Sequence, residues 1–190
     1  MPKTTLFDKD KVLQNALEVF WLKGYHGTSM QDLVDSTGLN RSSIYNSFRD
    51  KFGLYLATLD YYSQVQSNHT HKVMVSSDSA LQVIRNLLAG NLKSTSEQPG
   101  GCFWVSCTAE FAEGETQVQD KIVENKQRML QLLGNLIKQA QEEGDLDLNT
   151  DSEKAALYLF SSIQGLRLTS LTESDPQKLS ELVEHIVKSL

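Results

Sequence analysis

The 190-residue chain is poor in proline, and it lacks the alternation of apolar and polar residues that is typical of strands. Its three prolines stand at positions 2, 99 and 176. Because proline is poorly tolerated inside helices, the long stretches without it permit long helices. Leu, Gln, Glu, Lys and Ala are abundant. The sequence therefore predicts an all-α protein.

Cysteine and long apolar runs are scarce as well. Two cysteines cannot build a disulfide framework, and they suit a reducing compartment. No stretch approaches the roughly 18 consecutive apolar residues that a membrane helix needs. Residues 1–8 lack the charged-then-apolar plan of a signal peptide. These absences predict a cytoplasmic protein with no membrane partner, and the length fits one large domain or two small ones.

The formal net charge is −6, which by itself disfavours a nucleic-acid partner, because phosphate binding favours positive charge. The charge is, however, unevenly distributed. Residues 1–52 carry seven Lys or Arg against six Asp or Glu, a balance of +1, whereas residues 53–190 carry eleven against eighteen, a balance of −7. Residues 39–51 alone have a balance of +2. The acidity therefore belongs to the second part of the chain.

Apolar residues recur at spacings of three and four along nine segments, which is the pattern of amphipathic helices. Candidate capping residues precede several of these segments, among them Asp8, Asn40 and Asp50. Residues 94–101 hold Pro99 and two glycines and are predicted to form a loop. The nine predicted helices are 8–23, a short one between Thr28 and Thr37, 41–48, one that begins after Asp50 and runs through Tyr62, 80–93, 102–112, 116–143, 152–169 and 177–190.

Residues 28–51 have the pattern of a helix-turn-helix, in which a tight turn joins two short helices. Thr28, with Gln31 three residues later, fits a capping box at the start of the first helix. Gly38 suits the turn, because glycine readily adopts a positive φ. In such motifs the first residues of the second helix enter the major groove of DNA. The alternative is a plain helical corner in another kind of all-α protein.

The start of the second helix is rich in polar residues that have no evident role in a core. An arginine such as Arg41 can form two hydrogen bonds with guanine, while Asn, Ser and Tyr side chains reach base edges or phosphate oxygens. The serines could instead be ordinary solvated residues, so Arg41 and Tyr45 are the strongest candidates. The residues predicted to contact double-stranded DNA on this basis are Asn40, Arg41, Ser42, Ser43, Tyr45 and Asn46.

Residues 8–56 resemble the DNA-binding domain of the TetR (tetracycline repressor) family of bacterial regulators. The resemblance implies that Thr28 and Lys51 contact phosphate, that residues 40–43 open the recognition helix, and that Tyr45 and Asn46 touch backbone or bases. The sequence departs from the family pattern at Asn46, where a larger aromatic or basic residue is common, and at Phe52-Gly53, where an acidic residue is commoner. The matching residues are Ala16, Phe20, Gly24, Tyr25, Thr28, Gly38, Ser43, Ile44, Tyr45, Phe48, Lys51 and Leu54.

The resemblance also implies a domain organisation and a mode of action. Residues 1–52 would form a three-helix DNA-binding domain, and residues 53–190 a helical domain that binds an effector and dimerises, with the helix from about residue 51 joining the two. The protein would be a ligand-responsive transcriptional regulator and no enzyme, located in the bacterial cytoplasm and associated with the nucleoid while bound to DNA. A repressor that a small-molecule effector releases from a palindromic operator is the expected form.

A homodimer is expected on geometric grounds. One short recognition helix reads few bases, whereas two helices about 34–36 Å apart read a palindrome. The predicted interface is a four-helix bundle of residues 152–169 and 177–190 from each chain. Gly165 would permit close approach of the helices, and the packing side chains would be Leu157, Phe160, Leu168, Leu182 and Ile186.

The effector pocket of an all-α protein is expected between helices. Candidates are aromatic or hydrogen-bonding residues of segments 103–111 and 158–167, although aromatic stripes at helical spacing belong more often to a core. The −7 balance disfavours an anionic effector unless Arg85 or Arg167 lines the pocket. The candidate pocket residues are Phe103, Trp104, Cys107, Phe111, Tyr158, Gln164 and Arg167.

Cys102 follows a Pro-Gly-Gly sequence and begins a predicted helix, and a helix N-terminus favours the nucleophilic thiolate form of cysteine. An alternative function is therefore a regulator that senses oxidants or electrophiles through Cys102, unless this residue is simply a small buried one. Cys102 and Cys107 are about 140° apart around a helix, which disfavours a bond between them. The sequence contains no zinc spacing, catalytic constellation or phosphate-binding loop, so no metal and no cofactor is expected. An alternative from another class is a helical enzyme or interaction module that does not bind DNA.

Overall fold

The computed structural model describes residues 7–90, 92, 102–111 and 113–190, and within them it contains nine helices. The all-α prediction is confirmed. Positions 91 and 93 of the predicted helix 80–93, the predicted loop 94–101, Ala112 and residues 1–6 lie outside the described residues. The helices are α1 (Lys9–Gly27), α2 (Met30–Thr37), α3 (Arg41–Phe48), α4 (Lys51–Val75), α5 (Ala80–Gly90), α6 (Phe103–Glu110), α7 (Thr116–Glu143), α8 (Ser152–Thr169) and α9 (Pro176–Lys188).

Short polar side chains begin several helices, as their positions in the sequence predict. The Asp8 carboxylate accepts hydrogen bonds from the backbone N–H groups of the first turn of α1. Asn40 accepts from the N–H of Ser43, and Asp50 from the N–H of Gly53. Such caps satisfy the amide donors that a helix leaves unpaired at its start. Gly38 ends α2 with a φ of 70°, so the turn between α2 and α3 is the left-handed one that glycine favours.

The predicted capping box of α2 was wrong by one residue. Ser29, and not Thr28, caps α2: its hydroxyl accepts from the N–H of Asp32, while the Asp32 carboxylate accepts from the N–H of Ser29. Thr28 is engaged elsewhere, because its hydroxyl donates to the carbonyl of Gly24 at 2.6 Å. The Asp32 carboxylate also forms an ion pair with Lys23, which is the largest cause holding its pKa well below the usual range.

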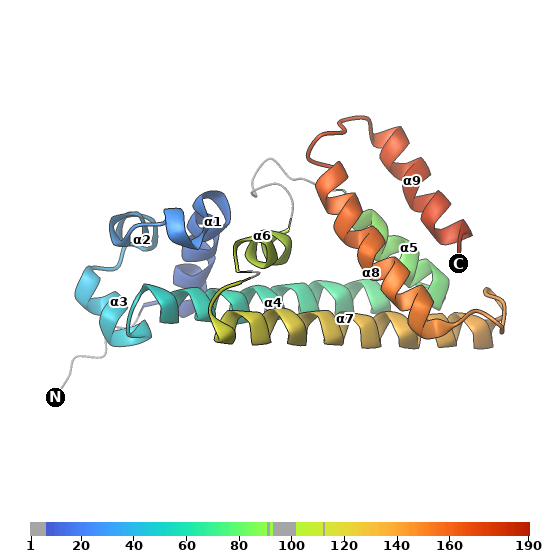
Figure 1. Ribbon diagram of the computed structural model, residues 1–190, viewed down its shortest axis with the longest axis horizontal. Helices are drawn as coiled ribbons and strands as arrows, with labels where there is room; N and C mark the ends of the chain where they lie inside the picture. The colour runs from blue at the N-terminus through green and yellow to red at the C-terminus, as the bar shows by residue number, and fades with distance from the viewer. Residues whose placement is uncertain (1–6, 91, 93–101, 112) are drawn as a thin grey trace.

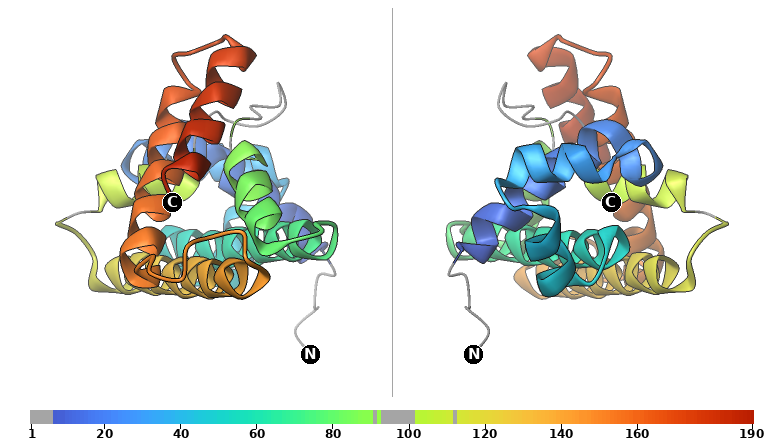
Figure 2. Two further views of the ribbon diagram at one scale, coloured as in Figure 1. Left: turned by 90° about the vertical axis from the view of Figure 1, so that its right-hand side faces the viewer. Right: turned by 90° about the vertical axis from the view of Figure 1, so that its left-hand side faces the viewer.

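The helices form an elongated arrangement around two long ones. Helices α4 and α7 run side by side along the molecule, with α1–α3 at one end and α5, α8 and α9 at the other (Figure 1). Helix α6 packs against both α1 and α7, so it lies between the two ends. Viewed end-on, α4 and α7 lie at the base of the molecule and α8 and α9 rise above them (Figure 2). None of the described helices has the length and apolar content that crossing a bilayer requires.

The buried apolar side chains form two separate cores. The first, called the head core, joins α1–α4 to α6 and the start of α7, and it contains Phe20, Phe48, Tyr55, Tyr62, Phe103, Trp104 and Phe111. The second, called the body core, joins α5, α8 and α9 to the later part of α7, and its buried members are all Ala, Val, Ile or Leu. Helix α6 therefore shares a core with the predicted DNA-binding domain, although it lies beyond the predicted boundary at residue 52.

Candidate functional site

The predicted DNA-contacting residues of α3 form one polar surface. Asn40, Arg41, Ser42 and Asn46 are exposed, Tyr45 is 49% exposed, and Ser43 is half-buried. The opposite side of α3 is fixed by Ile44 and Phe48, which are buried in the head core. Because the apolar face anchors the helix, the polar side chains are free to meet a partner. This surface is the candidate nucleic-acid interface.

The sequence reasoning missed two residues beside this surface. Gln31 of α2 accepts a hydrogen bond from the Arg41 guanidinium at 3.5 Å, which links the two helices across the turn. Arg49 is exposed and ends α3 with a φ of 73°, an uncommon conformation for a residue that is not glycine. The positive charge of Arg49, directly after the recognition helix, was a signal in the sequence for a contact with DNA. The sequence did not indicate its left-handed backbone conformation.

Thr28 and Lys51, to which the resemblance assigns phosphate contacts, are engaged inside the protein. Thr28 is only 2% exposed. The Lys51 ammonium donates to the carbonyls of Tyr25 and Thr28, each at 2.8 Å, and lies 4.2 Å from the centre of the Tyr25 ring. Burial lowers the pKa of Lys51, partly offset by Glu110. Their phosphate contacts stay predictions, and both side chains hold the junction between α1 and α2.

The short segment that follows Gly24 at the end of α1 is held by one negatively charged and one positively charged side chain. Gly24 breaks the helix with φ 71° and ψ 168°, which leaves the N–H groups of Tyr25 and His26 without partners inside the helix. The Glu110 carboxylate at the end of α6 accepts from these two N–H groups at 2.9 and 2.8 Å. Lys51 binds carbonyls at the other end of the segment. Glu110 thus connects α6 directly to the segment that leads into α2, and the sequence offered no signal for it.

Gly53, one of the departures from the family pattern, fits a tight approach at the start of α4. A Cβ at this position would lie 1.9 Å from the carbonyl oxygen of Phe48. The N–H of Gly53 donates to the Asp50 carboxylate at 2.7 Å. Glycine therefore permits the close passage from α3 to α4, and the start of α4 stays regular.

Three of the predicted pocket residues belong to the head core instead of a cavity wall. Phe103, Cys107 and Phe111 are at most 2% exposed. Phe111 stacks on Tyr55 with ring centres 5.4 Å apart. Burial raises the pKa of the Cys107 thiol to about 11. The aromatic stripe of α6 is thus mainly a packing surface.

The face of α6 that carries Trp104 lines a cavity of about 460 Å³. Gln164 of α8 belongs to the same wall, as predicted. One buried polar atom here has no hydrogen-bond partner, the amide oxygen of Gln164. A buried polar group without a partner is costly, so this oxygen would gain from a bound molecule that donates a hydrogen bond. The remaining lining residues are Val105, Thr108, Ala109, Ile122, Asn125, Lys126 and Phe160.

The other two predicted pocket residues lie outside this cavity. Tyr158 is 39% exposed and lines a shallow surface depression with Thr150 and Lys154. The Arg167 guanidinium donates to the sulfur of Cys102 at 2.8 Å. The Tyr62 hydroxyl lies 3.9 Å from the same sulfur. Cys102 itself is 3% exposed, so the thiol is buried between a cation and a phenol.

Most of the predicted dimer residues are exposed on α8 and α9. Leu157 and Leu168 are 50% and 53% exposed, and they lie about three turns apart on one side of α8. Gly165 is exposed, and a Cβ there would meet nothing within 4 Å. Leu182 is 36% exposed. Phe160 is half-buried and lines the cavity described above.

Ile186 was wrongly assigned to the interface. It is 5% exposed and belongs to the body core. Both faces of α9 carry apolar residues, and only the fold determines which face turns inward. Leu171, which follows α8 and is 51% exposed, is an apolar residue near this surface that the sequence reasoning missed.

Comparisons with known proteins cover both parts of the chain. A model of the C-terminal domain of tetracyclin repressor-like proteins matches residues 80–186, and a model of bacterial regulatory proteins of the tetR family matches residues 12–58. The HTH-type transcriptional repressor ComR of Escherichia coli is 25% identical over 180 residues, which cover 93% of this chain and 86% of ComR. YezE, an uncharacterised HTH-type transcriptional regulator of Bacillus subtilis, is 24% identical over 97% of this chain and 96% of YezE.

One solved structure in the comparison includes DNA. It contains a cysteine-substituted form of CifR, a TetR-family regulator, with a 26-base-pair operator duplex. The similarity extends over 100% of this chain and 99% of that chain, with a TM-score of 0.83 and 25% sequence identity. The likeness in backbone fold therefore extends through both parts of the chain.

Proposed function

The chain belongs to the TetR family of bacterial DNA-binding transcriptional regulators, and we propose that it is a homodimeric repressor released from a palindromic operator by a small-molecule effector. The exposed polar surface of α3, anchored by Ile44 and Phe48, is the observation that carries the proposal. ComR is named a repressor, and CifR was solved with operator DNA, which supports both parts. The bacterial cytoplasm, with nucleoid association during DNA binding, is the corresponding location.

In this proposal α3 lies in the major groove with its N-terminal half against the bases. Arg41 and Tyr45 are one helical turn apart, so they face the same side. Arg41 forms paired hydrogen bonds with a guanine, and Tyr45 contacts the backbone or a base edge. The N-terminus of α3 adds a favourable dipole for a nearby phosphate. Lys51 and Thr28 keep α2 and α3 in place. They therefore support the affinity for DNA indirectly, by positioning these two helices.

Dimerisation through α8 and α9 brings two such surfaces to one operator. The exposed residues Leu157 and Leu168 would be covered by their copies in the partner chain, and Gly165 leaves room for close helix approach. Exposed apolar side chains gathered on one face are typical of a contact surface. Two recognition helices about 34–36 Å apart then read the two halves of a palindrome.

The effector binds in the cavity between α6, α7 and α8 in this proposal. Trp104 and Thr108 of α6 line that cavity, and Glu110 at the end of the same helix holds the segment before α2. A ligand that shifts α6 therefore acts on the DNA-binding helices through one rigid element. The effector favours release only if it binds the released arrangement more tightly than the DNA-bound one.

A gel-shift titration against genomic fragments at several salt concentrations tests the DNA-binding part. Sequence-selective, salt-sensitive binding is expected, and its absence would refute the proposal. Arg41→Ala is expected to weaken operator binding by about 1–3 kcal/mol while thermal unfolding stays unchanged. Lys188→Ala, which removes a charge at the far end of the chain, is the matched control and should bind normally. Equal losses on operator and random DNA would instead make Arg41 a phosphate contact.

The contact between Arg167 and the Cys102 sulfur favours a second candidate, a regulator that senses oxidants or electrophiles. The Arg167 guanidinium and the Tyr62 hydroxyl both lie beside the sulfur, which gives this thiol two polar neighbours. Treatment with N-ethylmaleimide forms a carbon–sulfur bond at Cys102, and the thiol proton passes to solvent before the maleimide carbanion takes up a proton. Operator release by this reagent should disappear in Cys102→Ser and persist in Cys107→Ser. Release that survives in Cys102→Ser removes this candidate.

A further inference from the structure

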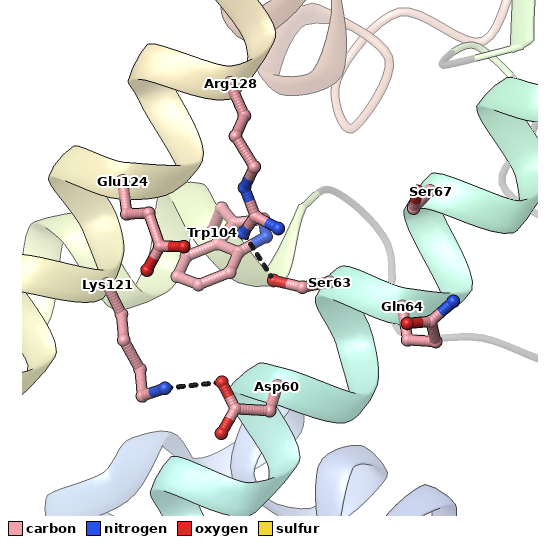
Figure 3. A pocket seen from close by; sticks show the side chains of 8 residues that line it. All are labelled: Asp60, Ser63, Gln64, Ser67, Trp104, Lys121, Glu124 and Arg128. Carbon is pink, nitrogen blue, oxygen red and sulfur yellow. Dashed lines mark hydrogen bonds and ion pairs between the residues drawn. The ribbon is translucent and has the colours of Figure 1, made fainter.

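A second cavity, of about 170 Å³, lies between α4 and α7 on another side of Trp104. Its lining is largely polar and includes Ser63 of α4 and Arg128 of α7. Figure 3 shows the Arg128 side chain reaching from α7 toward Ser63, with the Trp104 indole beside its guanidinium. The other lining residues are Asp60, Gln64, Ser67, Lys121 and Glu124.

Two hydrogen-bond donors in this cavity, from Trp104 and Arg128, are not fully satisfied. The Trp104 side chain is buried, with 5% of the residue exposed, and its N–H has no partner. The Arg128 guanidinium donates to the Ser63 hydroxyl at 3.4 Å, a long hydrogen bond that leaves most of its donors available. An acceptor with negative charge placed between these groups would satisfy the indole and the guanidinium together.

The charged residues around the cavity leave Arg128 as the available cation. Lys121 forms an ion pair with Asp60, as the dashed line in Figure 3 marks. Among the described residues Arg128 forms no ion pair, not even with Glu124 one turn away on α7. Glu124 lines the cavity too and is exposed, so water screens its repulsion of an anion.

The polar cavity continues into a more apolar one of about 320 Å³. Ser63 and Arg128 line both, so the two are adjacent. The larger cavity adds Met74, Met129 and Leu132 to its wall. The larger cavity is also lined by the polar side chains of Gln66, Thr70, His71 and Asn125. Together the two cavities offer a charged end and a wider end with apolar side chains in the groove between α4 and α7, which suits a molecule with an anionic head and a short apolar chain.

We propose that the groove between α4 and α7 binds an amphipathic carboxylate, with Arg128, Trp104 and Ser63 holding the carboxylate and the adjoining cavity taking the apolar chain. Arg85 and Arg167, which the sequence suggested for an anionic ligand, serve other contacts: Arg85 bonds Glu184, and Arg167 donates to Cys102. Because Trp104 of α6 lines both this site and the proposed effector cavity, a ligand bound in the groove also contacts α6. An influence of that ligand on DNA binding rests on the proposed function, whereas binding of the carboxylate does not.

Calorimetric titration with octanoate and with 1-octanol tests the site, because the two probes differ in the charged head. Octanoate should bind more tightly than 1-octanol. Arg128→Gln should weaken octanoate about tenfold, the effect of losing a charge-assisted hydrogen bond, and leave 1-octanol unchanged. Lys138→Gln removes the same charge from an exposed position further along α7, outside the cavities described above, and is the matched control. Glu124→Gln should strengthen octanoate binding, because it removes a nearby negative charge.

Equal binding of octanoate and 1-octanol, or equal losses in Arg128→Gln and Lys138→Gln, would overturn the proposal. So would tighter binding of octylamine, since the site would then select cations. Trp104→Phe gives an independent reading, because it keeps an aromatic ring and removes the N–H, and it should weaken octanoate alone. A gel shift with octanoate present separates the two proposals: octanoate that binds without altering operator affinity leaves the site intact and removes only its link to regulation.

Discussion

The two cores of the molecule are built from different side chains. In the head core, rings from α1, α4 and α6 pack in stacked and edge-to-face pairs, such as Phe20 on Tyr55 and Tyr62 on Phe103. The buried members of the body core are aliphatic throughout. Aromatic pairs prefer particular ring orientations, whereas aliphatic side chains repack with less loss. A displacement of α6 therefore cannot be accommodated by repacking only a few side chains of the head core.

This difference matters because α6 contacts both the cavity and the head core. Its Trp104 face lines the cavity of about 460 Å³, and its Phe103 and Phe111 side chains pack inside the head core. Packed cores respond to small shifts by switching between arrangements more readily than by deforming continuously. In the function that we propose, an aromatic core between this cavity and α3 would favour transmission, and the aliphatic body core would serve as a stable base for a dimer.

The largest expected effect comes from removing one ring of the head core. Phe111→Ala should lower the free energy of unfolding by about 3–5 kcal/mol and abolish operator binding, because it removes the contact between α6 and Tyr55. Leu159→Ala, at a fully buried position of the body core, should cost about 2–5 kcal/mol. Urea titrations give both values. Gel shifts under native conditions should still detect DNA binding by the Leu159 variant, and loss of binding in both variants would contradict the distinction.

Alkaline pH should also act on the head core alone. Burial raises the pKa of Cys107 to about 11 and, as the largest cause, raises the pKa values of Tyr55 and Tyr62 as well. In the unfolded chain these groups lose their protons from about pH 9 upward, while the folded chain retains them. The unfolded state then binds fewer protons, so stability falls as the pH rises.

Between pH 8 and pH 10.5 the free energy of unfolding should fall by roughly 4 kcal/mol on this account. Urea titrations at the two pH values measure the change. Tyr55→Phe removes one titrating hydroxyl from the head core and should make the fall smaller. The body core contains no ionisable group among its buried members, so the effect arises from the thiol and phenol groups of the head core. An unchanged pH dependence in Tyr55→Phe would exclude that residue as a source.

The smallest of these effects concerns the link between the regions. Glu110→Gln keeps the shape of the side chain but leaves one acceptor oxygen for the N–H groups of Tyr25 and His26. Stability should fall by about 1–2 kcal/mol, and an effector should release DNA less completely, because α6 loses its hold on the segment before α2. Glu113→Gln, at an exposed position just after α6, is the control. Full effector response in the Glu110 variant would exclude this route of coupling.

Much of the DNA-binding part could be predicted, because its signals are local. The cap at Asn40, the turn at Gly38 and the buried positions Ile44 and Phe48 depend on residues within one or two helical turns. The capping box was misplaced because Thr28 and Ser29 are both good caps. The choice between them depends on the bond from Thr28 to Gly24, which only the broken end of α1 makes possible.

The effector part could be predicted less well. Trp104 and Gln164 line a cavity whose role as an effector pocket stays a prediction, whereas Phe103, Cys107 and Phe111 lie on the packed side of α6. Helical spacing identifies a stripe of residues, but it does not tell which neighbour covers that stripe. Ile186 was assigned to the wrong side of α9 for the same reason.

The sequence by itself determined the all-α class, the helix-turn-helix and its polar reading surface, because helix periodicity, caps and turn glycines act over a few residues. Only the tertiary structure decided that α6 joins the head core, that Glu110 and Lys51 hold the segment between α1 and α2, and that Arg128 faces Trp104 across the groove. These contacts join residues that are distant in the sequence. They depend on how amphipathic faces are shared among helices, and several arrangements would satisfy the same periodicity.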